Sequence, residues 1–99
     1  MRIAIVLTAA LVTAPLAVSA QDKNSGRNLA ASCAMCHGTD GRGAVGYEPL
    51  AGMAKGELVR KFTEFRSGAK PATVMHQISK GYTDPQIELI AEYFSAQKK

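Results

Sequence analysis

Apolar side chains near the C-terminal end of the chain recur at the spacing of a helix. Four of them lie at positions i, i+3, i+4 and i+7, namely Ile87, Ile90, Ala91 and Phe94. This periodicity places them on one face of an amphipathic helix and differs from the strict alternation of a strand. Thr83 and Gln86 form a capping-box pattern and Pro85 lies in the first turn, so the helix is predicted to begin there.

Two earlier segments also have helical patterns. Residues 57–67 carry an apolar stripe that consists of Leu58, Val59, Phe62 and Phe65. Gly68 follows directly, and glycine is the residue most often found just past the end of a helix. Residues 72–80 predict a shorter helix that holds Met75 and Ile78 and ends before Gly81.

The segment before the cysteines is also predicted to be helical. Residues 24–32 form a short helix that leads towards Cys36, with Asn24 or Ser25 as its N-cap. Gly26 and Ala30 lie one turn apart and give this helix a small-residue face. Such a face lets another helix approach closely, and we expect the C-terminal helix to be its partner. Because no segment alternates like a strand, the predicted fold class is all-α, without internal repeats.

The start of the chain has a different character from the rest. Residues 1–20 hold one charge, Arg2, followed by an apolar run that ends in small residues up to Ala20. This plan is typical of a secretory signal peptide. The alternative is an uncleaved membrane anchor, but the apolar run contains Pro15 and is shorter than the ~20 residues that span a bilayer. We therefore expect cleavage after Ala20, which leaves residues 21–99 as one exported domain.

This remaining domain is small and poor in aromatic side chains, since the whole chain has no Trp, three Tyr and three Phe. Domains of this size rarely gain enough stability from hydrophobic burial alone and commonly use disulfides, a metal or a cofactor. The net charge of +4, which falls by one when Arg2 leaves, is too modest to suggest nucleic-acid binding. A disulfide between Cys33 and Cys36 would close too small a loop to constrain the fold.

Cys33, Cys36 and His37 form a C-x-x-C-H motif, the attachment pattern of a c-type haem. Two thiols about one helical turn apart suit the two vinyl groups of one porphyrin edge, and the adjacent imidazole reaches the iron. A thioredoxin-like redox motif is a poorer interpretation because no strand precedes Cys33. A structural zinc site would need a fourth ligand, and the one other His or Cys is His76. The motif therefore predicts one covalent haem c with His37 as an axial ligand.

The second axial position has four candidate ligands, Met35, Met53, Met75 and His76. Met35 lies between the cysteines, too close to the proximal side to cross the ring. Met53 follows the motif closely, whereas Met75 lies far enough downstream for the chain to wrap around the macrocycle. His76 is the neighbour of Met75, and on a helix only one of the two can face the iron. We favour Met75, with His76 and Met53 left open, and a Met/His pair would raise the reduction potential and close the iron to other ligands.

Six of the nine glycines lie between Gly38 and Gly56, which predicts an irregular loop after the motif. Residues 41–46 match the pattern G-x-G-x-x-G literally, but the strand and βαβ unit of a dinucleotide site are missing. We expect these glycines instead to let the backbone run close against the haem edge.

Together these features resemble those of a class I cytochrome c over essentially the whole exported domain. The resemblance rests on the helix before the motif, the glycine-rich loop, the distal methionine and a C-terminal helix with the aromatic pair Tyr93 and Phe94. It implies four to five short helices wrapped around one haem, with Met75 as distal ligand. It also implies that the Pro49 carbonyl accepts a hydrogen bond from His37 Nδ1, which would fix the tautomer of the imidazole.

More narrowly, residues 49–52, 65–68 and 73–84 are similar to the single-haem halves of dihaem cytochromes. They are most similar to the cytochrome subunit of flavocytochrome c sulfide dehydrogenase, although a second C-x-x-C-H motif is absent here. The resemblance implies a periplasmic one-electron carrier, not itself an enzyme, that serves an FAD-containing sulfide dehydrogenase subunit. The alternatives are a freely diffusing shuttle to a terminal oxidase or reductase and, less favoured, a five-coordinate haem sensor or peroxidase.

Four basic residues flank the predicted haem-facing loops, namely Lys55, Arg66, Lys70 and Lys80. Their charges would steer an acidic redox partner or pair with haem propionates. An ordinary solvated surface charge is the favoured interpretation for each of them. No nucleic-acid partner is expected, and no membrane span after cleavage.

Overall fold

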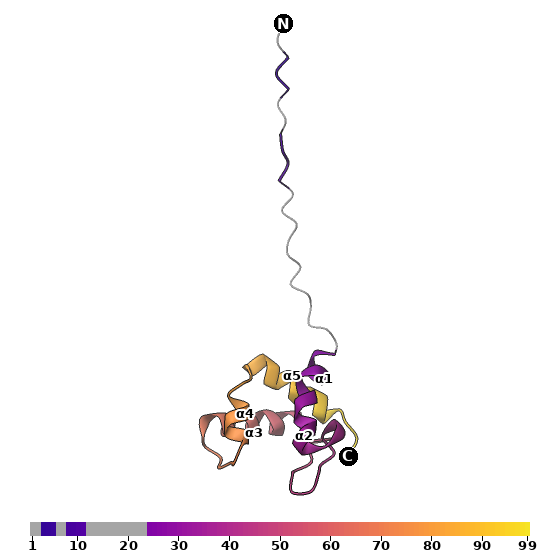
Figure 1. Ribbon diagram of the computed structural model, residues 1–99, viewed down its shortest axis with the longest axis vertical. Coiled ribbons are helices and arrows are strands. Elements are labelled where there is room, and N and C mark those ends of the chain that lie inside the picture. The colour runs from indigo at the N-terminus through magenta and orange to yellow at the C-terminus, as the bar shows by residue number, and fades with distance from the viewer. Residues whose placement is uncertain (1–2, 6–7, 12–23) are drawn as a thin grey trace.

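The computed structural model describes residues 3–5, 8–11 and 24–99, and its regular elements are helices (Figure 1). They are α1 (Ser25–Ala30), α2 (Ala34–His37), α3 (Lys55–Ser67), α4 (Met75–Ser79) and α5 (Asp84–Ser95), with the 3-10 turns η1 (Ala31–Cys33) and η2 (Thr39–Gly41). No strand occurs among the described residues. The predicted all-α fold class is therefore confirmed.

The predicted leader, residues 1–20, lies mostly outside the described residues, so cleavage after Ala20 remains a prediction. Its described parts, residues 3–5 and 8–11, have no regular secondary structure. No helix in the part of the chain that the structure describes is long and apolar enough to cross a membrane.

Helices α1 and α5 pack directly on each other, as the small-residue face predicted (Figure 1). An ideal Cβ on Gly26 would lie 2.7 Å from the carbonyl oxygen of Leu89, closer than side chains tolerate. Ala30, one turn later, is buried in the core. Because α1 continues through η1 into α2, this contact ties the segment that carries the cysteines to α5.

Helix α5 supplies half of the buried apolar core. Ile87, Ile90, Ala91 and Phe94 are each at most 1% exposed, and they pack with Leu58 and Phe62 of α3. The predicted capping box is present: Thr83 Oγ1 accepts a hydrogen bond from Gln86 N–H at 3.3 Å, and Gln86 Oε1 accepts one from Thr83 N–H at 2.9 Å. Both the start and the buried face of this helix are therefore confirmed.

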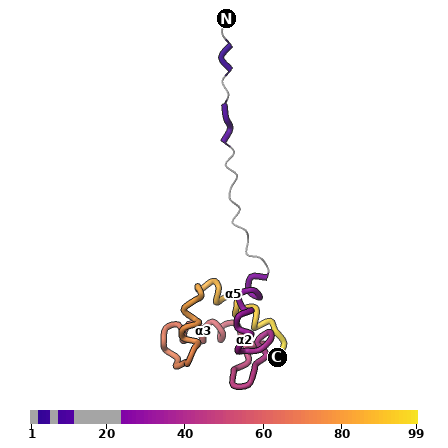
Figure 2. Tube along the Cα trace, viewed as in Figure 1, coloured from indigo at the N-terminus to yellow at the C-terminus, as the bar shows by residue number. Residues whose placement is uncertain are grey.

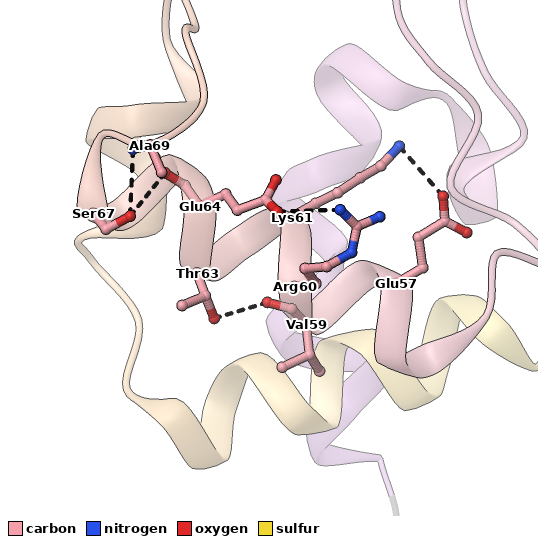
Figure 3. A network of polar contacts seen from close by, with 8 residues as sticks. All are labelled: Glu57, Val59, Arg60, Lys61, Thr63, Glu64, Ser67 and Ala69. Atoms are coloured by element: carbon pink, nitrogen blue, oxygen red, sulfur yellow. Dashed lines mark hydrogen bonds and ion pairs between the residues drawn. The ribbon is translucent and has the colours of Figure 1, made fainter.

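Helix α3 begins two residues before the predicted residue 57 and ends, as predicted, before Gly68. Val59 and Phe65 of its predicted stripe are half-buried rather than buried. The other faces of α3 carry polar contacts along the helix (Figure 3), which join Arg60 to Glu64, Lys61 to Glu57, Thr63 to the Val59 carbonyl and Ser67 to the Glu64 carbonyl. The helix thus has one face in the core and another stabilised by its own side chains.

Two predicted helices are shorter in the structure. The one expected over residues 72–80 begins only at Met75, because Val74 has a non-helical φ of −133° and its carbonyl accepts the first helical hydrogen bond, from Gln77 N–H at 2.9 Å. The β-branched side chains of Thr73 and Val74 slightly disfavour helical backbone at this point. The helix expected over residues 24–32 ends at Ala30, where η1 winds more tightly before α2 begins.

The loop between α2 and α3 folds back beside the C-terminal end of the chain (Figure 2). Gly41 is buried in it with φ +73°, and an added Cβ would lie 2.7 Å from the ring of Phe94. Only glycine allows that backbone conformation at that contact without strain. The structure thus gives Gly41 a packing role within the protein, and the expected contact of the glycines with a haem edge remains a prediction.

Candidate haem-binding site

The two cysteines carry free thiols on either side of the junction between η1 and α2. Cys33 is half-buried against the hydrophobic core, whereas Cys36 is exposed. Burial is the main cause that raises the pKa of the Cys33 thiol above its ordinary value before attachment. No disulfide joins Cys33 and Cys36, and the two residues lie one helical turn apart, which is the arrangement that thioether attachment requires.

His37 ends α2, and its imidazole is oriented by the following loop. Nδ1–H donates a hydrogen bond of 2.7 Å to the carbonyl oxygen of Glu48. The ring also meets that of Tyr47 edge to face, with 6.0 Å between centroids. A neutral imidazole that donates from Nδ1 keeps the lone pair of Nε2 for a metal ion. The donor chemistry at this position therefore fits an axial ligand of a haem iron.

The prediction that the Pro49 carbonyl accepts this hydrogen bond is wrong, because the acceptor is the carbonyl of the preceding residue, Glu48. Proline restricts the residue before it to an extended backbone, and Glu48 occupies that position. The proline ring itself packs near Gly43, where an added Cβ would lie 3.0 Å from Pro49 Cγ. Pro49 therefore shapes the loop next to the acceptor, and its place among the haem-contacting residues remains a prediction.

The structure separates one of the four distal candidates from the other three. Met35 is 90% exposed, in keeping with its exclusion as a ligand. Met53 and Met75 are both half-buried and pack against the core. His76 follows Met75 on α4, and its Nδ1 is buried without a hydrogen-bond partner among the described residues. The structure thus leaves Met75, His76 and Met53 as candidates, and the choice of Met75 remains a prediction.

Ser79 is a residue of this region that the sequence analysis missed. It is fully buried on α4, and its hydroxyl also lacks a hydrogen-bond partner within the described part of the chain. It lies four positions after Met75 and three after His76, so each of these two residues is within about one turn of it on a five-residue helix. These two polar atoms, on the same helix as Met75, have hydrogen-bonding capacity that a bound group or an ordered water can meet.

Two further residues, Glu48 and Lys61, also escaped the sequence analysis. Lys61 on α3 places its Nζ 2.8 Å from Glu48 Oε1 and 3.8 Å from Glu57 Oε1. The hydrogen bond from Lys61 is the largest of the causes that lower the pKa of the Glu48 carboxyl. No sequence signal marks this pair, because the residues lie on different elements and neither belongs to a motif.

Three of the four basic residues considered for partner docking are engaged within the protein. Lys55 Nζ lies 3.1 Å from Glu88 Oε2, Arg66 pairs with Asp84, and Lys70 Nζ lies 5.4 Å from the centre of the Phe65 ring. These contacts favour the plainer interpretation of structural surface charges for those three. A steering role for any of them, or for Lys80, remains a prediction. Within the described ranges, no cluster of three or more His, Cys, Asp or Glu residues is arranged to hold a metal ion.

A family model described as cytochrome c matches residues 24–98 of the chain. The chain is 38% identical over 78 residues to the cytochrome subunit of sulfide dehydrogenase of Chlorobaculum tepidum, a match that covers 79% of this chain and 71% of that protein. It is 34% identical over 83 residues to cytochrome c-554(548) of Halomonas halodenitrificans, covering 80% of this chain and 100% of that protein.

A solved structure of cytochrome c4 from Acidithiobacillus ferrooxidans has a similar fold, with a TM-score of 0.66 and 31% identity. The match covers 73% of this chain and 49% of that chain, so the present protein spans about half of it. Other curated relatives are also longer, and the chain spans 28–44% of their lengths.

Proposed function

Because the chain belongs to the cytochrome c family, and is thus an electron-transfer protein with covalently bound haem c, we propose that it carries single electrons in the periplasm. Cys33 and Cys36 hold the haem through thioethers, and His37 and Met75 are the axial ligands. The observation that carries this proposal is the hydrogen bond from His37 Nδ1 to the Glu48 carbonyl, which leaves Nε2 of a motif histidine free for iron.

Each of these residues has a distinct role in the proposed chemistry. When bound, the haem supplies one iron that alternates between the ferric and ferrous states. The His37 imidazole is held in one tautomer and made a stronger donor by its hydrogen bond. The soft Met75 thioether favours ferrous iron and closes the second axial position, so the site passes electrons without binding other ligands. The chain then acts as a carrier and performs no catalysis of its own.

We place this carrier beside an FAD-containing sulfide dehydrogenase subunit that reduces it. The support is the 38% identity with the cytochrome subunit of sulfide dehydrogenase, of which the chain spans 71%. In this arrangement the chain would accept electrons one at a time from that subunit and hand them to a further redox partner. Other relatives are named as electron acceptors of thiosulfate dehydrogenase, which is consistent with a dehydrogenase as the donor.

A freely diffusing shuttle to a terminal oxidase or reductase is a second candidate. It is favoured by the match to cytochrome c-554(548), whose whole length the chain spans. The docked subunit and the shuttle differ in how long the complex with the redox partner lasts, and not in their haem chemistry. Gel filtration of the purified holoprotein with a purified sulfide-oxidising flavoprotein separates them: co-elution supports the docked subunit, and separate elution with rapid electron transfer supports the shuttle.

The ligand set is tested on the ferric holoprotein. We expect the weak absorption band at the red edge of the visible spectrum that accompanies methionine ligation of ferric haem. We also expect slow or undetectable binding of carbon monoxide to the ferrous form. A spectrum without this band, together with rapid binding of carbon monoxide, would indicate a five-coordinate sensor or peroxidase and overturn the proposal.

A further inference from the structure

Glu48 makes hydrogen bonds through both its backbone and its side chain. Its backbone carbonyl accepts the 2.7 Å hydrogen bond from His37 Nδ1, and its carboxylate accepts a 2.8 Å hydrogen bond from Lys61 Nζ. The first contact faces the haem motif and the second faces α3. One residue thus connects the candidate proximal ligand to the longest helix of the domain.

The segment around Glu48 is exposed from Ala44 to Pro49, and within it Tyr47 N–H donates to the Ala44 carbonyl at 3.0 Å. Backbone hydrogen bonds hold the loop on both sides of that segment: Gly43 N–H donates to the His37 carbonyl at 2.7 Å, and Leu50 N–H donates to the Gly41 carbonyl at 2.7 Å. Between these two points, the Glu48 side chain reaches the body of the protein at Lys61.

Lys61 is well suited to hold Glu48 in one place. Only 15% of its side chain is exposed, and its position on α3 is restrained further by Glu57, one turn earlier (Figure 3). An ion pair with one largely buried partner loses less to solvent screening than a fully exposed pair. The pKa of Glu48 is lowered chiefly by the hydrogen bond from Lys61, with a smaller contribution from the charge of Lys70, so Glu48 is ionised at neutral pH.

We propose that Lys61 is a positioning residue for the proximal ligand: by holding the Glu48 carboxylate, it keeps the Glu48 carbonyl against Nδ1–H of His37. The inference rests on the proposed role of His37 as an iron ligand. A firmly held acceptor makes the imidazole a stronger donor to iron and lowers the reduction potential, whereas a loosened acceptor does the opposite.

The positioning effect of Lys61 and its bare positive charge change the reduction potential in opposite directions. Removing a positive charge near the haem favours the ferric state and lowers the potential. Loosening the hydrogen bond on His37 raises the potential. A second lysine that is not bound to Glu48 therefore provides a matched control, and Lys70 serves because it stacks over Phe65 yet is close enough to influence Glu48.

The experiment uses the holoproteins of wild type, Lys61→Met, Glu48→Ala, the double variant, Lys70→Met and Lys61→Arg. The first readout is the rate at which the Nδ1–H proton of His37 exchanges with water, followed by NMR of the reduced proteins. We expect severalfold faster exchange in Lys61→Met and Glu48→Ala, no further increase in the double variant, and wild-type exchange in Lys70→Met and Lys61→Arg. The second readout is the midpoint potential, which we expect to be higher in Lys61→Met than in Lys70→Met.

Wild-type exchange in Lys61→Met, or a potential at or below that of Lys70→Met, would overturn the positioning role. Glu48→Ala keeps the question answerable if Lys61→Met does not fold, because it removes the exposed partner of the same pair. Failure of the proposed function is recognised separately, since the wild-type spectrum would then lack the signature of histidine and methionine ligation. A normal wild-type spectrum with unchanged exchange would reject the role of Lys61 alone.

Discussion

The proximal and distal sides of the proposed haem site differ in how far the polypeptide alone defines them. On the proximal side the donor, the acceptor and their support are all present: His37 donates to the Glu48 carbonyl, and Lys61 holds the Glu48 carboxylate. On the distal side the structure does not single out one candidate ligand, since Met53 and Met75 both pack against the core.

The distal side also contains polar atoms with unmet hydrogen-bonding capacity. His76 Nδ1 and the fully buried Ser79 Oγ have no hydrogen-bond partner among the residues described. Such atoms cost free energy that a bound group or an ordered water can recover. The comparison teaches that the candidate proximal ligand is oriented by contacts that the polypeptide itself supplies, whereas the distal candidates lie beside no such support and leave polar atoms without partners among the described residues.

The largest expected effect comes from removing the candidate proximal ligand, His37. His37→Ala should lower the yield of stable holoprotein by at least about tenfold, because the attached group loses its nearest ligand. The ratio of haem absorbance to protein measures the yield. His76→Ala is the matched control and should keep the yield and spectrum of the wild type. Normally ligated holoprotein from His37→Ala would contradict the proximal assignment.

The distal side is tested by Met75→Ala, which should open the iron and lower its potential by roughly 0.1 V or more, since axial ligands set haem potentials over ≈0.8 V. The measurements are the red-edge band, carbon monoxide binding and the midpoint potential. Met53→Ala is the control and should change none of them appreciably. An unchanged spectrum in Met75→Ala would move the distal ligand to His76 or Met53.

Support for the proximal motif is tested at the contact between α1 and α5. Gly26→Ala puts a Cβ 2.7 Å from the Leu89 carbonyl oxygen, so we expect a loss of about 1–3 kcal/mol in the free energy of unfolding. Gly56→Ala is the control, because nothing lies within 4 Å of the added Cβ on α3, and it should stabilise by roughly 0.5–1 kcal/mol. Urea unfolding followed by circular dichroism measures both, and equal effects would contradict the packing argument.

The helix that follows the distal segment is tested at its cap. Thr83→Ala removes one half of the capping box at the start of α5 and should cost about 1 kcal/mol of stability. Thr63→Ala removes a hydroxyl that bonds the Val59 carbonyl one turn back on α3 and should stay within ±0.5 kcal/mol. Thermal unfolding of the two variants provides the comparison, which fails if Thr63→Ala is the more damaging.

The smallest expected effect concerns the pH dependence of the Glu48–Lys61 pair. The pKa of Glu48 is lowered in the folded protein, so its contribution is present above the pKa of the unfolded state and is lost as the pH falls through the folded pKa. Because the carboxylate side is exposed, the contribution should be under about 1 kcal/mol. Urea unfolding at neutral and at acid pH gives the stability that each protein gains between the two. We expect Glu48→Ala and Lys61→Met to lack the same part of the wild-type gain. Unequal increments would show that the pair is not the source.

Much of the fold was predictable from local patterns. The capping box of Thr83 and Gln86 and the buried face of α5 depend on residues near one another in sequence, and both are present. The one-turn spacing of Gly26 and Ala30 also predicted a close helix contact, which α1 makes with α5. The shorter α4 was not predicted, because its late start follows from the non-helical backbone of Val74, and a β-branched side chain disfavours helix only slightly.

For the candidate site, the sequence by itself determined the attachment chemistry: Cys33, Cys36 and His37 are adjacent, so their spacing and ligand types follow from the order of residues. It also determined the helices whose apolar periodicity or caps are complete within one segment. Only the tertiary structure decided that Glu48 rather than Pro49 supplies the carbonyl for His37, that Lys61 holds Glu48, and that Ser79 is buried beside the distal candidates. The physical reason is that these contacts join separate elements, and their partners are set by loop path and helix packing, which no local pattern specifies.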